Sequence, residues 1–289
     1  MLDVGTCAGV EHWDPGECER VMRLIGQIAV NVFKESVRDK VLYNLVAFAV
    51  LMIAVSYLLG QLTAGQDMKI IKDLGLAAIA SFGRLIAVFI GIGLVWKEVE
   101  RRSIYSLLSK PIRRYEFILG KYAGLALTLF VNVVVMTAAF YAVLAYLNTQ
   151  FPESVQVTWP APATDPGMLR AIALISMELL LITAVALFFS TFSSPFLSAA
   201  LTLGLWVIGH FNDDLRSFET VVESPVAAYL ARGLYYVLPN FGAFDIKTQV
   251  VYALPVQWSY VVTTSAYGVA YIALLLAGAV AIFSRRDFK

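Results

Sequence analysis

Six long apolar segments constrain the fold of this chain more than any other feature. They cover residues 41–62, 75–96, 120–147, 168–192, 196–211 and 261–283, and the fifth is shorter than the others. A helix that crosses a lipid bilayer needs about 20 apolar residues at about 1.5 Å each. Because the apolar runs are continuous and do not alternate with polar residues, they predict membrane helices and not the strands of a barrel.

The composition agrees with an all-α integral membrane protein. Hydrophobic residues make up 59% of the chain and charged residues 15%, against about 45–50% and about 25% in soluble domains. The 22 basic and 21 acidic residues leave a net charge of +1, which argues against a nucleic-acid partner. The two cysteines, Cys7 and Cys18, exclude a disulfide-stapled secreted fold.

The distribution of basic residues predicts the orientation. Most of the 22 lie in residues 1–40, in residues 97–121 and in the C-terminal tail, which six spans place on one side of the membrane. We therefore expect a multi-pass protein of the cell (inner) membrane. The positive-inside rule places both of its termini in the cytoplasm. Residues 1–21 are an acidic tail without the apolar core of a signal peptide. Met22 is an alternative start, and residues 22–289 form a single transmembrane domain in this interpretation.

Residues 20–38 have the pattern of an amphipathic helix. Their polar side chains recur every three or four residues: Arg20, Arg23, Gln27, Asn31, Lys34 and Arg38. The stripe predicts an interfacial helix whose apolar face lies at the acyl boundary and contacts membrane lipid. The alternative is a cytoplasmic extension of the first span.

The loop between the second and third segments combines a strong positive charge with apolar residues. Pro111 forces a turn in it. Before the turn, one helical face carries Glu98, Arg101, Arg102 and Tyr105, and a small apolar knob consists of Ile104, Leu107 and Leu108. Such a shape suits docking into a groove of a soluble partner. The alternative, an ordinary positive-inside loop, explains the charge but neither the knob nor Glu98 and Glu100.

The same loop resembles the first cytoplasmic loop of ABC-2 type permeases. The resemblance rests on the string from Glu98 to Arg114, followed by Gly120-Lys121, and it extends over roughly residues 22–289. Residues 33–43, with Phe33, Glu35 and Arg38, look like the amino-terminal interface helix of that family, and residues 283–288 are similar to its closing helix. The nearest branch is the permease associated with copper-enzyme maturation in nitrous-oxide reductase operons.

The resemblance implies a six-span half-transporter that pairs with a second permease copy and with two separate ABC ATPase subunits. Residues 98–111 would be the coupling helix that lodges in the ATPase, and residues 190–195 would make a smaller second contact. The chain has no G-x-x-x-x-G-K-[ST] phosphate loop. We therefore expect no enzyme activity and no cofactor here, with ATP and magnesium bound in the partner subunit.

The sequence is compatible with transport, most simply export, and with two other functions. A non-transporting membrane anchor or assembly scaffold could dock an ATPase through the same loop. An intramembrane enzyme ranks third, because motifs such as H-E-x-x-H and G-x-S-x-G are absent from the sequence. The sequence does not distinguish among four classes of substrate: a lipid, a peptide, a drug, and a sulfur or copper-maturation species.

Residues 212–258 are expected to lie outside the membrane and to contact its outer leaflet. Tyr229, Leu234 and Val237 follow helical spacing until Pro239 interrupts the pattern. The resemblance suggests paired external helices that narrow the exit, so this segment is an external gate or a cap that only stabilises the fold.

Two charges lie deep within the apolar segments, away from the segment ends. Arg84 and Glu178 are at matching depths below the outer surface, so we expect them to form an ion pair that fixes helix packing or lines the transport path. Two further groups have incomplete metal-ligand patterns, and we expect no metal site in either: His210 with Asp213 and Asp214, and Cys7 with His12 and Cys18.

Overall fold

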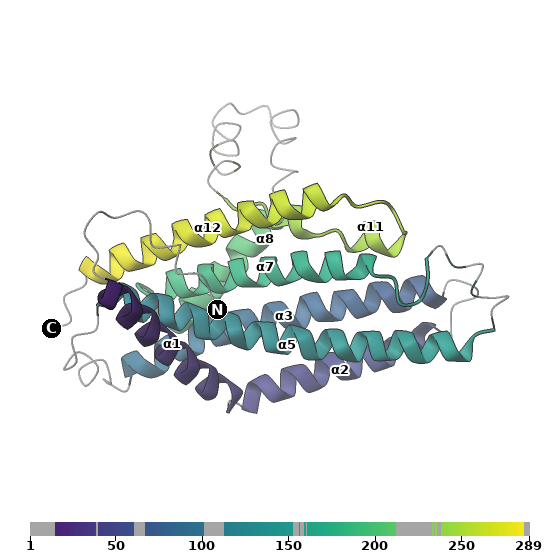
Figure 1. Cartoon of the computed structure of the whole chain (residues 1–289), viewed down its shortest axis with the longest axis horizontal. Coiled ribbons are helices and arrows are strands. Elements are labelled where there is room, and N and C mark those ends of the chain that lie inside the picture. Colours follow the sequence, from purple (N-terminus) through teal and green to yellow (C-terminus); the bar gives the residue numbers. More distant parts are fainter. Residues whose placement is uncertain are drawn as a thin grey trace.

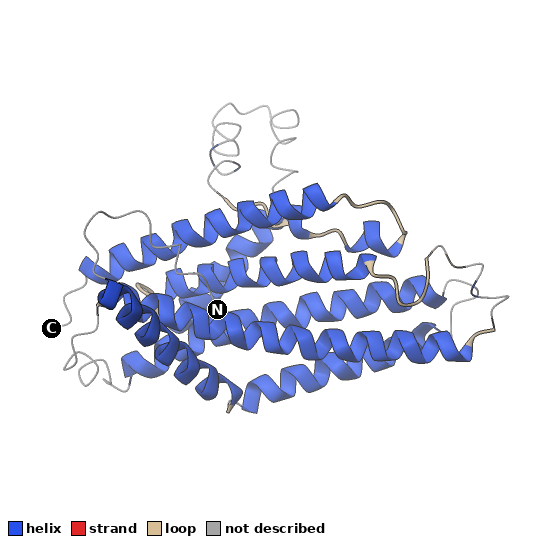
Figure 2. Ribbon diagram, viewed as in Figure 1, coloured by secondary structure: helices blue, strands red, loops and turns tan. Residues whose placement is uncertain are grey.

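The computed structural model describes residues 15–38, 40–60, 67–100, 113–152, 156, 159, 161–211, 233, 235 and 238–285. Its elements in these ranges are helices and connecting loops (Figure 2). Long helices lie side by side in an elongated bundle (Figure 1). In chain order the elements are α1 (Pro15–Val37), α2 (Lys40–Gly60), α3 (Asp67–Glu100), α5 (Arg114–Gln150), α7 (Gly167–Ser190), α8 (Pro195–His210), η2 (Gly242–Phe244), α11 (Lys247–Val251) and α12 (Trp258–Arg285).

Each predicted apolar segment coincides largely with one of these helices. Within the described residues, 4 stretches are long and apolar enough to cross a membrane: Met68–Ile92, Tyr115–Gln150, Gly167–Ser190 and Trp258–Ser284. Shorter apolar stretches lie at Leu45–Ser56 and Pro195–His210. The all-helical membrane fold is therefore confirmed, whereas the count of six spans stays a prediction.

Two helices begin earlier than their apolar segments because polar side chains in the first turns find partners. In α3, the Lys72 ammonium donates to the carbonyl oxygens of Ala161 (3.5 Å) and Pro162 (2.8 Å), so polar residues before position 75 can be helical. At the start of α5, the Arg113 backbone N–H donates to Glu116 Oε2 over 2.8 Å. This capping interaction allows the helix to begin before position 120.

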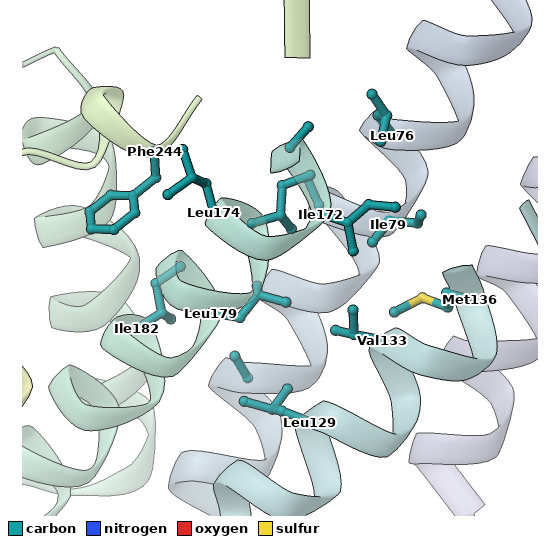
Figure 3. Close-up of a cluster of buried hydrophobic side chains, with 14 of the residues drawn as sticks. Leu76, Ile79, Leu129, Val133, Met136, Ile172, Leu174, Leu179, Ile182 and Phe244 are labelled. Carbon is teal, nitrogen blue, oxygen red and sulfur yellow. The ribbon is translucent and has the colours of Figure 1, made fainter. Parts of the chain in front are cut away.

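Helix α7 is the centre of the bundle. Its neighbours are α3, α5, α8 and α12, and most of its side chains are buried. Figure 3 shows Leu174, Leu179 and Ile182 of α7 in the cluster that they form with side chains of α3, α5 and η2. The α7 face toward α3 therefore offers a rigid platform for the charged residues it carries.

Helix α1 is distinct from α2 and lies obliquely across α5 at one end of the bundle (Figure 1). A turn at Arg38 separates it from α2, so α1 does not continue the second helix in a straight line. Gly120 and Gly124 of α5 let α1 approach closely, because a Cβ atom at Gly124 would lie 2.6 Å from the Ala29 carbonyl oxygen. Glycines spaced four apart commonly form such close helix contacts in membranes.

The two ends of the bundle gather different elements (Figure 1). At one end lie α1, the last turns of α3, the first turns of α5 and the last turns of α12, and the rings of Phe117 and Phe283 stack there at 6.0 Å. At the opposite end lie α11 and the first turns of α3, α7 and α12.

Candidate functional site

Arg84 of α3, Glu178 of α7 and Trp206 of α8 form a charged cluster inside the bundle. Arg84 Nη1 lies 3.3 Å from Glu178 Oε1, and the indole Nε1 of Trp206 donates to the same oxygen over 2.8 Å. The Arg84 guanidinium also lies over the Trp206 ring, 4.6 Å from its centroid. The structure thus brings together the two charges singled out by the sequence and adds a third residue.

The cluster has the properties of a satisfied ion pair. The Glu178 side chain is 4% exposed and the Arg84 side chain 17%. A buried charge without partners is costly, but here the carboxylate accepts two donors and the guanidinium is paired, stacked on an aromatic face and bonded to Ser81 Oγ at 3.3 Å. Such a group holds three helices together.

A glycine next to Arg84 allows this approach of α3 to α7. A Cβ atom at Gly83 would lie 2.6 Å from Leu179 Cδ1, one residue along the chain from Glu178. Trp206 was missed at the sequence level, although an indole N–H donor inside an apolar segment is a usable signal, because a buried Trp usually finds a hydrogen-bond partner.

Two further charged side chains, those of Lys72 and Lys121, are buried within the long apolar helices α3 and α5. Lys72 is 2% exposed, and its ammonium is held by backbone carbonyls of the α5–α7 connection. Lys121, which we assigned to the cytoplasmic loop, is 1% exposed and lies 5.4 Å from the centroid of the Phe117 ring. Both lysines begin apolar segments, where a long side chain can reach a polar partner.

The predicted coupling residues lie mostly outside the described residues. Glu98 and Glu100 belong to the last turn of α3, and their side chains are not described. Outside the description altogether are Arg101, Arg102, Ile104, Tyr105, Leu107, Leu108 and Pro111. The structure does place the two anchors of this loop, the end of α3 and the start of α5, at the same end of the bundle (Figure 1).

The predicted interfacial residues lie on α1. Phe33 is half-buried, whereas Glu35 and Arg38 are exposed, as is the polar stripe from Arg20 to Lys34. Part of the apolar side of α1 packs against protein, and the contact of this helix with the acyl boundary stays a prediction. Ile28 and Val32 contact Gly120 and Gly124 of α5, because the missing side chains of these glycines leave room for α1 against the bundle.

Of the external gate or cap residues, Tyr229, Leu234 and Val237 lie outside the described residues, whereas Pro239 is buried. The segment after Pro239 is fixed to two helices. The Phe241 N–H donates to the Gly209 carbonyl of α8 (2.9 Å), and the Asn240 N–H donates to the Tyr267 hydroxyl of α12 (2.9 Å).

The potential metal ligands are only partly described. His210 stacks near Trp206, with ring centroids 5.5 Å apart, whereas Asp213, Asp214, Cys7 and His12 lie outside the described ranges. Among the described residues, no group of three or more His, Cys, Asp or Glu side chains is placed to hold a metal ion.

Comparison with known families assigns the chain. The family model described as ABC-2 family transporter protein matches residues 27–288. The chain belongs to the ABC-2 family. No curated protein matches it significantly. Membership makes this ABC-2 protein a multi-pass membrane component of an ABC transporter, a class of subunit that typically lacks the ATPase domain and works with an ABC ATPase. The match does not distinguish the copper-enzyme-maturation branch from the rest of the ABC-2 family.

Proposed function

We propose that this ABC-2 protein is the permease subunit of an exporter that is driven by a separate ATPase. The observation that carries the proposal is the gathering of α1, the end of α3, the start of α5 and the end of α12 at one end of the bundle (Figure 1). This end holds both anchors of the 98–111 loop. A soluble ATPase that binds the loop can therefore move several helices at once.

The contacts at this end supply a route for the movement. The loop continues directly into α3 and α5. Helix α5 is tied to α1 through Gly120 and Gly124, and to α12 through the stacked rings of Phe117 and Phe283. In the proposed cycle, ATP binding closes the ATPase subunits, the loop transmits the movement, and the interface between two permease copies opens outward.

The proposed topology, the partner permease and the branch of the family rest on the charge pattern and on the resemblance to ABC-2 type permeases. Six spans place both termini in the cytoplasm of the cell (inner) membrane, with residues 22–289 as one transmembrane domain and residues 212–258 as an outer gate or cap. The partner permease is a second copy of this chain. The copper-enzyme-maturation branch rests on the loop sequence alone, and the genes adjacent to this one test it.

We assign the Arg84, Glu178 and Trp206 cluster to helix packing and not to the transport path. Its donors and acceptors already satisfy one another, so a passing substrate would have to break these contacts. The cluster would keep α8 attached to α3 and α7 while the bundle moves.

The competing function is a scaffold that docks an ATPase without moving a substrate. A complex of this chain and its ATPase, reconstituted in sealed vesicles, distinguishes the transporter from the scaffold. A transporter accumulates a candidate cargo on one side only with hydrolysable ATP, and the cargo stimulates ATP hydrolysis. A scaffold binds the ATPase equally well, but ATP hydrolysis does not respond to cargo and no accumulation follows.

A further inference from the structure

A small pocket lies at the end of the bundle opposite to the coupling loop. It has a volume of about 230 Å³ and is formed by the start of α7 and the connection from α11 to α12. Two of its lining residues are charged, Asp165 and Arg170, and apolar side chains such as Val250, Leu254 and Val256 form much of the rest.

The basic group of the pocket is held in a fixed orientation. Arg170 Nη1 donates to the Val256 carbonyl oxygen over 2.5 Å, and the guanidinium lies 4.8 Å from the centroid of the Trp258 ring. A guanidinium has five N–H donors, so one bond to a carbonyl leaves capacity for a phosphate, which arginine binds in a bidentate manner. Arg170 also lies in the first turn of α7, where the helix dipole favours an anion.

The acidic group is positioned by the backbone. The Gly167 N–H donates to Asp165 Oδ1 over 2.8 Å, which fixes the carboxylate at the start of α7. The carboxylate also interacts electrostatically with the buried Lys72. A carboxylate has about four acceptor sites on two oxygens, so it can accept a further ammonium. The pocket therefore offers a cationic and an anionic group to one small ligand.

The surroundings indicate that this ligand comes from the membrane. Large side chains next to the pocket are exposed, with Trp258 at 62%, Leu254 at 56% and Tyr252 at 55%. Lys69 lies 5.2 Å from the centroid of the Tyr252 ring. Aromatic and basic residues at the ends of apolar helices mark the headgroup layer of a bilayer. The volume is below the about 300–1,000 Å³ typical of pockets for drug-sized ligands, so the pocket fits a headgroup and not a whole lipid.

We propose that this pocket binds the headgroup of a phospholipid that carries both a phosphodiester and a primary ammonium, as phosphatidylethanolamine does. The phosphodiester contacts Arg170 and the ammonium contacts Asp165, while the acyl chains lie along exposed apolar side chains such as Leu169 and Val262. The site is independent of the proposed transport activity and of its substrate.

Native mass spectrometry of the delipidated full-length protein tests the proposal with three dioleoyl lipids that differ in headgroup: phosphatidylethanolamine, phosphatidylcholine and phosphatidylglycerol. We expect phosphatidylethanolamine to bind about tenfold more tightly than the other two, since only its primary ammonium can donate charge-assisted N–H hydrogen bonds to the Asp165 carboxylate. Soluble phosphoethanolamine at millimolar concentration should displace it, which shows that the headgroup is recognised.

Two substitutions assign the roles. Asp165→Asn keeps an oxygen that can accept the Gly167 N–H but removes the charge, so the preference for phosphatidylethanolamine over phosphatidylcholine should vanish. Arg170→Gln keeps an N–H donor for the Val256 carbonyl but loses the guanidinium charge. It should therefore lower the binding affinity for each of the three lipids by about tenfold. Lys247→Gln is the matched control, because Lys247 lies at the same end, pairs with Asp245 at 3.2 Å and does not line the pocket.

The affinities are compared only among variants whose melting temperatures match that of the unsubstituted protein, and Arg170→Lys replaces Arg170→Gln if the latter does not fold. Equal binding of the three lipids by the unsubstituted protein would overturn the proposal. Retention of the full phosphatidylethanolamine preference in Asp165→Asn, undiminished lipid affinity in Arg170→Gln, or an equal loss in Lys247→Gln would overturn it as well.

Discussion

Trp206 of α8 donates its indole N–H to Glu178 of α7 over 2.8 Å, at the same carboxylate oxygen that the Arg84 guanidinium contacts from α3. Helix α8 has 16 residues and exposes much of its apolar surface. Its length of about 24 Å is less than the hydrocarbon thickness of about 30 Å. A short helix of this kind gains from a polar anchor to its neighbours, and Trp206 provides one.

Replacement of Trp206 by Phe should destabilise the protein by about 1–2 kcal/mol, because a buried interhelical hydrogen bond is lost while a smaller aromatic ring remains at this position. Thermal unfolding in detergent measures the change. Trp258→Phe is the matched control, since Trp258 is 62% exposed. Equal melting temperatures for Trp206→Phe and the unsubstituted protein would contradict the anchoring role.

Replacement of Glu178 by Ala should cost about 3–5 kcal/mol, because Arg84 then lacks its buried partner. The charge swap Arg84→Glu with Glu178→Arg should recover part of the lost expression. The structure adds a refinement: an arginine at position 178 would face the N–H donor of Trp206, so adding Trp206→Phe to the swap should increase the recovery. Mild single substitutions without any recovery in the swap would mean that the pair contributes little.

The sequence was sufficient to locate the long helices but not to predict the contacts between them. Continuous apolar runs locate α2, α3, α5, α7, α8 and α12, because a bilayer demands length and hydropathy from each span independently. The first turns of α3 and α5 extend beyond the apolar segments, and hydropathy alone cannot show that Lys72 and Glu116 find polar partners there.

The packing of α1 required the structure for a different reason. An amphipathic stripe specifies which face of a helix avoids water, but it does not distinguish lipid from protein as the apolar neighbour. The glycines of α5 supply that information, since Gly120 and Gly124 make room for Ile28 and Val32. The same limitation applies to Trp206, whose partner belongs to another helix.

Gly124→Ala should detach α1 from α5. The added Cβ would meet the Ala29 carbonyl oxygen and Val32 Cβ at 2.6 Å, and a backbone atom cannot move aside by rotation of a side chain. We expect a loss of about 1–3 kcal/mol in thermal unfolding experiments. Gly204→Ala on α8 is the matched control, because nothing lies within 4 Å of its added Cβ. Equal effects of the two substitutions would argue against a close α1–α5 contact.

Single cysteines at Gln66, Thr158 and Glu219 should react with an impermeant thiol reagent from outside intact cells, whereas a cysteine at Ser106 should react only after permeabilisation. The expectation follows from the excess of basic residues on the side of residues 97–121. Both native cysteines are replaced by Ser for this experiment. Labelling of Ser106→Cys in intact cells would invert the proposed topology.

The central claim is that residues 98–111 couple this permease to an ATPase, and copurification of the ATPase with loop variants tests it most directly. Leu107→Asp with Leu108→Asp places two carboxylates into the docking groove, so the variant should reach the membrane at a normal level but lose the ATPase, and transport with it. Ser103→Asp with Ser106→Asp is the control, since it changes the loop charge equally and retains the apolar knob. We predict that the control keeps the ATPase. An undiminished complex in the Leu107 and Leu108 variant would contradict the coupling role and leave the loop as a determinant of orientation alone.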